Sequence, residues 1–571
     1  MHNSSNSSGF DIGLAAIRRF YFYIVALISL TAALFAIDGL LDILSDAWLN
    51  SAGVGVGAIG YRRDIIARNG SILLVASAVF LLHWTYIQQR LNDATERHAA
   101  LRKLFLYGGL AVAIGFAAVQ GGRLLSGAAF LALGGPENRS DILSGGWLHL
   151  LLMSGVGLGL SFFLQRTLLA DGDYGRETTR AGTVRRLFQT ILGLAGLIGL
   201  IFGSAQALRI VWEILLNLTD PGLNIGWSQG QLSGGLTAAI IGGLILRLNE
   251  RRWQATIRAN QSEAGTALRR FFLYFAVVLS ALAVLAPAAF LLREALLILF
   301  FGEDGGTLGD LLRRMGEPLS FIPAGLISWF WYQRTLVREA EAYGVSREAF
   351  IIRRVYHYAV AAVALALLWF GLVEILSAGL DVLFTRSGSA VGRFWIRPLV
   401  TGLSLLAVSV PVWTQHWRTV QQAARQDDAA GHAERTSLPR RLYLYGVALA
   451  GAVLILVNLS QVFYRLFQLL LDVTGVGFFT FEGVNELARG LVALALWLAH
   501  VMAIRADGRS EERYRLNNQA ASEPEQPEHA AAPLPHPPAE RRILEERIAA
   551  LEKELSAARG QLAEMTRVKN A

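Results

Sequence analysis

The sequence contains no cysteine and little charge. Without cysteine there can be no disulfide, thiolate metal site, cysteine nucleophile or iron–sulfur ligation. Charged residues make up 17% of the 571 residues, whereas soluble chains usually carry about 25%. Hydrophobic residues make up 53% and are gathered into long blocks. This composition indicates a membrane protein.

Signatures of enzymes are also lacking. The ten histidines show no paired metal-ligand spacing, and the chain has no Walker motif, nucleophile elbow or paired-carboxylate motif. We therefore expect no enzyme activity and no cofactor, and no substrate can be named. The formal net charge of +8 does not indicate nucleic acid binding, because basic residues of membrane proteins gather in cytoplasmic loops.

Twelve apolar blocks are each long enough to cross the bilayer as a helix. Helices satisfy their own backbone polar groups in lipid, so the sequence predicts an all-α polytopic protein with about twelve transmembrane helices and the lipid bilayer as its partner. Residues 1–17 are polar and serine-rich, which predicts a disordered N-terminus. No small-residue cleavage site follows the first block, so we expect an uncleaved first helix.

A basic pair followed by aromatic residues recurs six times along the chain. The first copy, RRFYFY, begins at residue 18, and the later copies begin at 102, 185, 269, 353 and 440. Their spacings of 84, 83, 84, 84 and 87 residues indicate internal repetition. Each repeat holds two apolar blocks. The predicted repeats are 18–101, 102–184, 185–268, 269–352, 353–439 and 440–515.

A longer period is also present. The tetrapeptide QRTL occurs at 165–168 and again at 333–336, which is two repeats later. The unit is therefore interpreted as a four-helix block used three times.

Two helices per repeat place every basic pair on the same side of the membrane. Arg and Lys extend to lipid phosphates, and Tyr favours the headgroup level, so the motif is interpreted as an interfacial anchor; a ligand site built from the six motifs is the alternative. Most Arg and Lys residues lie between repeats, which predicts a plasma (inner) membrane protein with both termini cytoplasmic. The predicted anchors are Arg18, Arg19, Tyr23, Arg102, Tyr107, Arg269, Tyr274, Arg353, Tyr358, Arg440 and Tyr445.

Polar residues recur near the far end of the first helix of several repeats. Their offsets from the basic pair, 20–21 and 24–25, fall on one helical face about 30 Å away. One interpretation is an amphipathic stretch along the outer surface. The other is a polar ring that lines an outer vestibule. The candidate ring consists of Asp38, Gln206, Arg209, Arg293, Glu374, Gln461 and Arg465.

The C-terminal tail differs in composition. Residues 516–540 hold six of the fourteen prolines, which predicts an extended linker. Residues 541–566 then show apolar residues with alternating spacings of four and three, typical of a coiled coil. We expect self-association through this segment; a single helix lying on the membrane is the alternative. The predicted seam is Leu544, Ile548, Leu551, Leu555, Leu562 and Met565.

The motifs resemble those of a bacterial membrane family called domain of unknown function 5671. The resemblance rests on the basic–aromatic helix starts and on helix ends such as Leu82-His83-Trp84 and Gln415-His416-Trp417-Arg418. It covers roughly residues 15–505. Two departures occur in the third repeat: its motif, RRLFQT, lacks the final Tyr, and its second helix ends without a His-Trp pair. The resemblance implies a location in the membrane and carries over no activity and no functional residue.

Two functions of different class remain open. The first is a non-enzymatic oligomeric membrane scaffold or sensor with a cytoplasmic coiled coil. The second is a transporter or channel with a path between parallel repeats, which would have the polar ring as its mouth. The heptad spacing favours the first.

Overall fold

The computed structural model describes residues 5–49, 56–135, 146–172, 174–177, 179–216, 225–301, 308–344, 346–384, 395–471, 481–522 and 546–557. The described residues form helices and no β-strand. The chain divides into two compact parts, Met1–Arg505 and Ala506–Ala571. The larger part, Met1–Arg505, holds the helical repeats.

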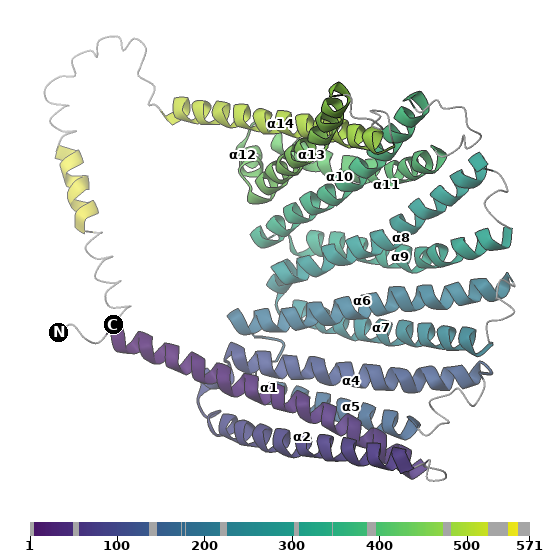
Figure 1. Ribbon diagram of the computed structural model, residues 1–571. Coiled ribbons are helices and arrows are strands. Elements are labelled where there is room, and N and C mark those ends of the chain that lie inside the picture. The colour runs from purple at the N-terminus through teal and green to yellow at the C-terminus, as the bar shows by residue number, and fades with distance from the viewer. Residues whose placement is uncertain are drawn as a thin grey trace. The chain divides into compact units, whose positions relative to one another are not determined.

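Six pairs of long helices correspond to the six predicted repeats (Figure 1). Each predicted apolar block lies inside one helix, so the two-helix repeat is a helical hairpin. The hairpins are α1 (Ser5–Leu49) with α2 (Val56–Gln89), α4 (Ala100–Ala132) with α5 (Trp147–Ala170), α6 (Thr179–Leu215) with α7 (Ile225–Ala259), α8 (Ala267–Phe301) with α9 (Leu308–Tyr343), α10 (Arg347–Phe384) with α11 (Ile396–Ala424), and α13 (Leu438–Leu470) with α14 (Phe481–Ser522).

Three short helical turns separate these hairpins at regular places. They are α3 (Ala94–Arg97), the 3₁₀ turn η3 (Gln261–Gly265) and α12 (Ala429–Arg435). Each follows the first hairpin of a four-helix unit and precedes the second. The three units therefore share a connecting turn as well as their long helices.

The hairpins of the part Met1–Arg505 follow one another in a row. Every substantial contact among its described helices joins two helices of one hairpin or of hairpins that are neighbours in the chain. For example, α4 packs against α1 on one side and against α6 and α7 on the other. Neighbouring hairpins therefore share faces in chain order (Figure 1).

Eleven of the described helices are long and apolar enough to cross a membrane. The expected twelfth is α9, which packs against α8. It falls short by composition, because its start carries Asp310, Arg313, Arg314 and Glu317 and its interior carries two prolines.

Small residues bring α6 and α7 into backbone contact. A Cβ added at Gly242 would lie 2.5 Å from the backbone nitrogen of Leu200, and one at Gly203 would lie 2.4 Å from that of Ala239. Real Cβ atoms do not approach so closely, so only glycine permits this distance between the helices. Gly234, on the same helix, faces open space.

The aromatic residues of the repeated motif form much of the core near the start of each hairpin. In the second hairpin of each unit the ring at the fourth motif position is buried, in Phe105, Phe272 and Tyr443. In the first hairpin of two units the ring at the sixth position is buried, in Tyr23 and Tyr358. Tyr23 and Phe105 belong to one apolar cluster, and Tyr358 and Tyr443 to another.

Two predicted boundaries are corrected. Helix α1 begins at Ser5, so residues 5–17 of the predicted disordered segment are helical. Helix α14 extends to Ser522, so the first residues of the predicted linker 516–540 are helical. In the tail, residues 546–557 form a helix in which Ile548, Leu551 and Leu555 are exposed. Leu544, Leu562 and Met565 lie outside the described residues, and self-association remains a prediction.

Candidate functional site at the repeat junctions

A glutamate joins the two hairpins of each four-helix unit through the first basic pair of that unit. Arg19 Nε lies 2.9 Å from a Glu96 carboxylate oxygen. The related pairs are Arg186 with Glu263 at 2.7 Å and Arg354 with Glu434 at 2.5 Å. We call these three contacts the junction ion pairs. Each glutamate stands six residues before the next basic pair, so the three contacts are repeat-related.

The short turns place these glutamates. Each turn begins with a residue whose side-chain oxygen accepts a backbone hydrogen bond: Asp93 from Thr95, Asn260 from Ser262 and Asp428 from Gly431. Such caps fix the start of a helical turn. The capped turn then presents its glutamate to the arginine of the preceding hairpin.

A second set of cations lies deeper, at the start of the second hairpin of each unit. Arg102 and Lys103 both contact Asp171, at 2.8 Å and 3.0 Å, and all three side chains are almost fully buried. Arg269 contacts Glu250 at 2.7 Å and also Glu339. Removing one partner of a buried pair leaves an uncompensated charge, which is strongly destabilising.

In the third unit two neutral groups accept hydrogen bonds from the cation. Arg440 donates to Gln421 at 2.9 Å and to the hydroxyl of Tyr358 at 3.3 Å. Gln421 stands 19 residues before Arg440, as Glu250 stands 19 residues before Arg269. The same position therefore supplies an acceptor in both units, once charged and once neutral.

Tyrosine hydroxyls connect these groups. Tyr107 donates to Glu177 at 2.6 Å, and Glu177 also pairs with Arg185 at 2.9 Å. This contact links the first unit to the second, because Arg185 begins the second unit. Tyr358 likewise donates to Glu434 at 2.7 Å.

These contacts correct part of the interfacial-anchor interpretation. Arg102, Arg269 and Arg440 are at most 1% exposed and cannot reach lipid phosphates. Three tyrosines of the motif copies, Tyr23, Tyr107 and Tyr358, are also buried where they meet a neighbouring hairpin. The motif therefore holds hairpins together at these positions, since each of these side chains packs or pairs across the repeat boundary.

Other anchors keep exposed surface. Arg353 and Tyr445 are exposed, and Tyr274 and the cations Arg18 and Arg19 are half-buried. An interfacial position remains a prediction for these residues.

The charge of Glu263 is stabilised by its surroundings. Burial would raise the pKa of this carboxyl, but the hydrogen bond and charge of Arg186 and the charge of Arg185 outweigh burial and hold the pKa below its ordinary value. The ion pair is therefore intact at neutral pH. Its contribution to stability must decline in acid as the carboxylate is protonated.

The candidate polar ring is divided among separate local contacts. Asp38 accepts from Gln120 at 2.7 Å and lies 2.9 Å from His149 Nε2, so it joins α1, α4 and α5. Gln206 donates to Gln231 at 2.6 Å. These contacts lie in the first and second four-helix units.

The remaining ring residues also pair close to their own helices. Arg209 contacts Glu213 and Glu317; Arg293 contacts Glu294 and Thr401; Arg465 contacts Glu486. Glu374 is half-buried within electrostatic range of Arg489, and Gln461 is exposed. The structure therefore does not bring the seven residues together. Their partners lie on the same helix, as Glu213 does for Arg209, or on a neighbouring helix, as Thr401 does for Arg293.

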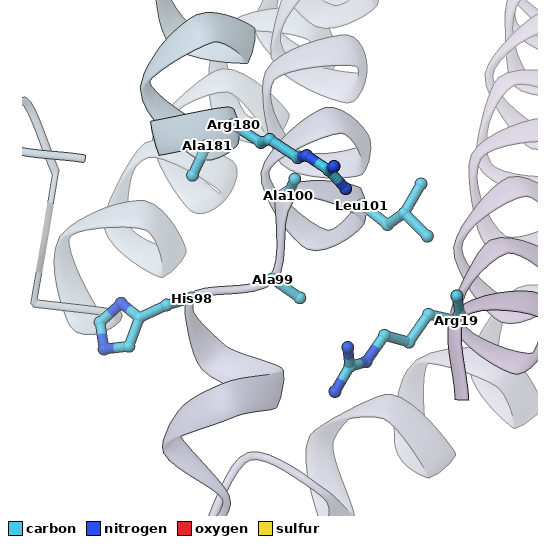
Figure 2. Close-up of a pocket in the computed structure, with 8 residues that line it drawn as sticks. Arg19, His98, Ala99, Ala100, Leu101, Arg180 and Ala181 are labelled. Carbon is cyan, nitrogen blue, oxygen red and sulfur yellow. The ribbon is translucent and has the colours of Figure 1, made fainter. Parts of the chain in front are cut away.

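A pocket of about 390 Å³ lies at the junction between the first and second units. Figure 2 shows Arg19 and Arg180 on opposite sides of the segment Ala99–Leu101, with both guanidinium groups directed toward the space beside it. His98 also lines the pocket. Among the described residues no cluster of three His, Asp or Glu side chains could hold a metal ion.

The junction glutamates were missed in the sequence, although a signal was present. Glu96, Glu263 and Glu434 all stand six residues before a basic pair. The six basic pairs were recognised, but the acidic residue upstream of every second pair was not included in the repeat.

Comparison with known families agrees with the threefold organisation. Three segments match the family described as Domain of unknown function (DUF5671): residues 19–161, 186–327 and 354–499. The chain belongs to this family. Each DUF5671 segment begins at the arginine of a junction ion pair and contains four long helices. No curated protein and no solved structure shows significant similarity to the chain.

Proposed function

We propose that this DUF5671 protein is a non-enzymatic, multi-pass membrane scaffold whose C-terminal helix brings copies together. Eleven long apolar helices support insertion in the membrane. The basic residues between repeats support a plasma (inner) membrane location with both termini in the cytoplasm. Under this proposal the row of hairpins is a rigid membrane part, and the tail carries the assembly function.

The observation that carries the proposal is the local pairing of polar residues. Asp38, Arg209, Arg293 and Arg465 each find partners on their own or a neighbouring helix. A binding or catalytic site requires several polar groups that converge on one space. Here the charged groups instead join neighbouring helices, which is what a structural role requires.

The tail supplies a surface for self-association. Ile548, Leu551 and Leu555 are more than half exposed and lie at heptad positions of one helix. An isolated helix of this length is marginal in water, so it gains stability by burying such a row against a partner. A second copy of the same helix fits, because the row is flanked by both glutamate and basic residues.

Two measurements on reconstituted protein test the proposal. We expect proteoliposomes to show no flux of small ions or neutral solutes above that of empty liposomes. We also expect the purified protein to be an oligomer, and deletion of residues 541–571 to yield monomers that still contain folded hairpins. Flux together with a monomeric full-length protein would contradict the scaffold proposal.

A transporter or channel is the second candidate, and one contact favours it. Asp38, Gln120 and His149 form a polar cluster between three apolar helices. Ionisable groups in such helices often belong to ion or proton paths. In this case Asp38→Asn should reduce flux, with Asp64→Asn, an exposed residue of α2, as the control.

A further inference from the structure

The pocket of Figure 2 lies where α1, α4 and α6 meet, outside every contact that the scaffold proposal uses. Its wall is formed by the N-terminal end of α4. The residue before that helix, Ala99, provides no side-chain cap, so the first backbone N–H groups of α4 have no side-chain acceptor at that position. These groups carry partial positive charge.

Arginine side chains border the same space. Arg19 comes from α1 and Arg180 from α6, and both are directed toward the start of α4 (Figure 2). Arg19 already contacts Glu96. Arg180 is exposed and has no hydrogen-bond or ion-pair partner among the described side chains. Two guanidinium groups and a helix start therefore face one pocket.

The junction between the second and third four-helix units shows which group binds at an equivalent helix start. Positions in the second DUF5671 segment follow those of the first by 167 residues, so Ala267 at the start of α8 corresponds to Ala100 at the start of α4. The backbone N–H of Ala267 donates to a carboxylate oxygen of Glu348 at 3.3 Å. At this junction the protein itself supplies an anionic oxygen to the helix start.

The first junction has the opposite charge at the corresponding position. Glu348 stands six residues before the third DUF5671 segment, and Arg180 stands six residues before the second. Arg180 therefore occupies the place of Glu348. It cannot accept from the helix N–H groups, and it adds a cation beside Arg19. The Glu348 carboxylate therefore binds the helix start at the second junction, whereas the corresponding residue at the first junction is Arg180, which lines the pocket.

We propose that this pocket binds a phosphate-type oxyanion in the place that the Glu348 carboxylate takes at the next junction. Arg19 and Arg180 pair with its charge, and the first N–H groups of α4 donate to its oxygens. The anion is either the headgroup phosphate of an acidic lipid or a free phosphate group. Bound there, it links three consecutive hairpins through one ligand, a role beyond the scaffold proposal.

The test uses the full-length protein in nanodiscs of neutral lipid. Inorganic phosphate is titrated while ³¹P line broadening reports binding, and retention of phosphatidylglycerol is measured by native mass spectrometry in mixed-lipid nanodiscs. The variant Arg180→Glu copies the next junction and should weaken binding at least about tenfold. The matched control is Arg176→Glu, an exposed residue of the same connection that does not line the pocket.

The outcomes separate the two sources of phosphate. Saturable phosphate binding that Arg180→Glu removes identifies a free phosphate; phosphatidylglycerol retention that Arg180→Glu removes, without phosphate binding, identifies a lipid headgroup. The proposal would be overturned by any of three results. These are an equal loss of binding in Arg176→Glu and Arg180→Glu, binding that Arg180→Glu leaves unchanged, and no binding of either phosphate or phosphatidylglycerol. Thermal stability of each variant shows that it is folded, and oligomeric state is a separate readout that belongs to the scaffold proposal.

Discussion

The junction ion pairs provide a graded experiment, because the same contact occurs three times at different depths. In the second unit the side chains of Arg185 and Glu263 are only 3% and 4% exposed. In the first unit the side chains of Arg18 and Arg19 are 38% and 25% exposed. Removing the charge of Glu263 leaves the buried Arg185 without solvent, although Arg186 keeps 20% exposure; removing that of Glu96 leaves Arg18 and Arg19 partly hydrated.

We therefore expect Glu263→Gln to lower the free energy of unfolding by about 3 kcal/mol, near the lower end for a broken buried pair because glutamine can still accept a hydrogen bond. We expect Glu96→Gln to lower it by about 1 kcal/mol or less. Unfolding is followed by tryptophan fluorescence during titration of SDS into mixed micelles. The control is Glu341→Gln, an exposed residue of α9.

A double-mutant cycle then isolates the contact itself. Arg186→Gln and Glu263→Gln should show a favourable coupling energy of about 1 kcal/mol or more, since the two groups are in direct contact. Equal losses for Glu96→Gln and Glu263→Gln, or a coupling energy near zero, would refute the reasoning that burial makes the second junction the stronger one.

Three further predictions concern the acid dependence of stability, the packing of α6 against α7 and a tyrosine hydrogen bond. The pKa of Glu263 is held below its ordinary value of 4.5. The ionised Glu263 therefore stabilises the fold above pH 4.5, and this stabilisation is lost as the pH falls through the lowered pKa. The acid dependence of the unfolding midpoint should be shallower in Glu263→Gln. Gly242→Leu should lower unfolding free energy by about 2 kcal/mol or more in the same SDS titration, since its Cβ would meet the backbone of α6, while Gly234→Leu should be nearly neutral. Tyr107→Phe removes a 2.6 Å hydrogen bond to a buried carboxylate and should cost about 2 kcal/mol by that assay, with the exposed Tyr445→Phe as its control.

The sequence was sufficient to predict the repeats and their long helices. The spacing of the basic–aromatic motifs specified six two-helix repeats, and Gln165-Arg166-Thr167-Leu168 with its later copy indicated the four-helix unit that the family matches confirm. These features are local: a motif and an apolar block are both readable along the chain.

The partners of the polar residues could not be predicted in the same way. Glu96 and Arg19 are 77 residues apart, and nothing in either local sequence specifies the contact. The partners of Asp38 are Gln120 and His149, which come from α4 and α5 and are far from it in the sequence. The burial of Arg102 was also missed, because basic residues beside apolar blocks usually extend to the interface. Its position depends on Asp171, which begins the next connection.

Self-association through the tail is the central claim of the scaffold proposal, and the lack of cysteine makes it directly testable. A single cysteine introduced as Leu551→Cys is placed on the predicted seam, and one introduced as Lys553→Cys is placed on the opposite face of the same helix. In membrane vesicles treated with a mild oxidant, we expect Leu551→Cys to form a disulfide-linked dimer and Lys553→Cys to remain mostly monomeric. Equal cross-linking of both variants, or none in either, would contradict the proposal that this helix brings copies of the protein together.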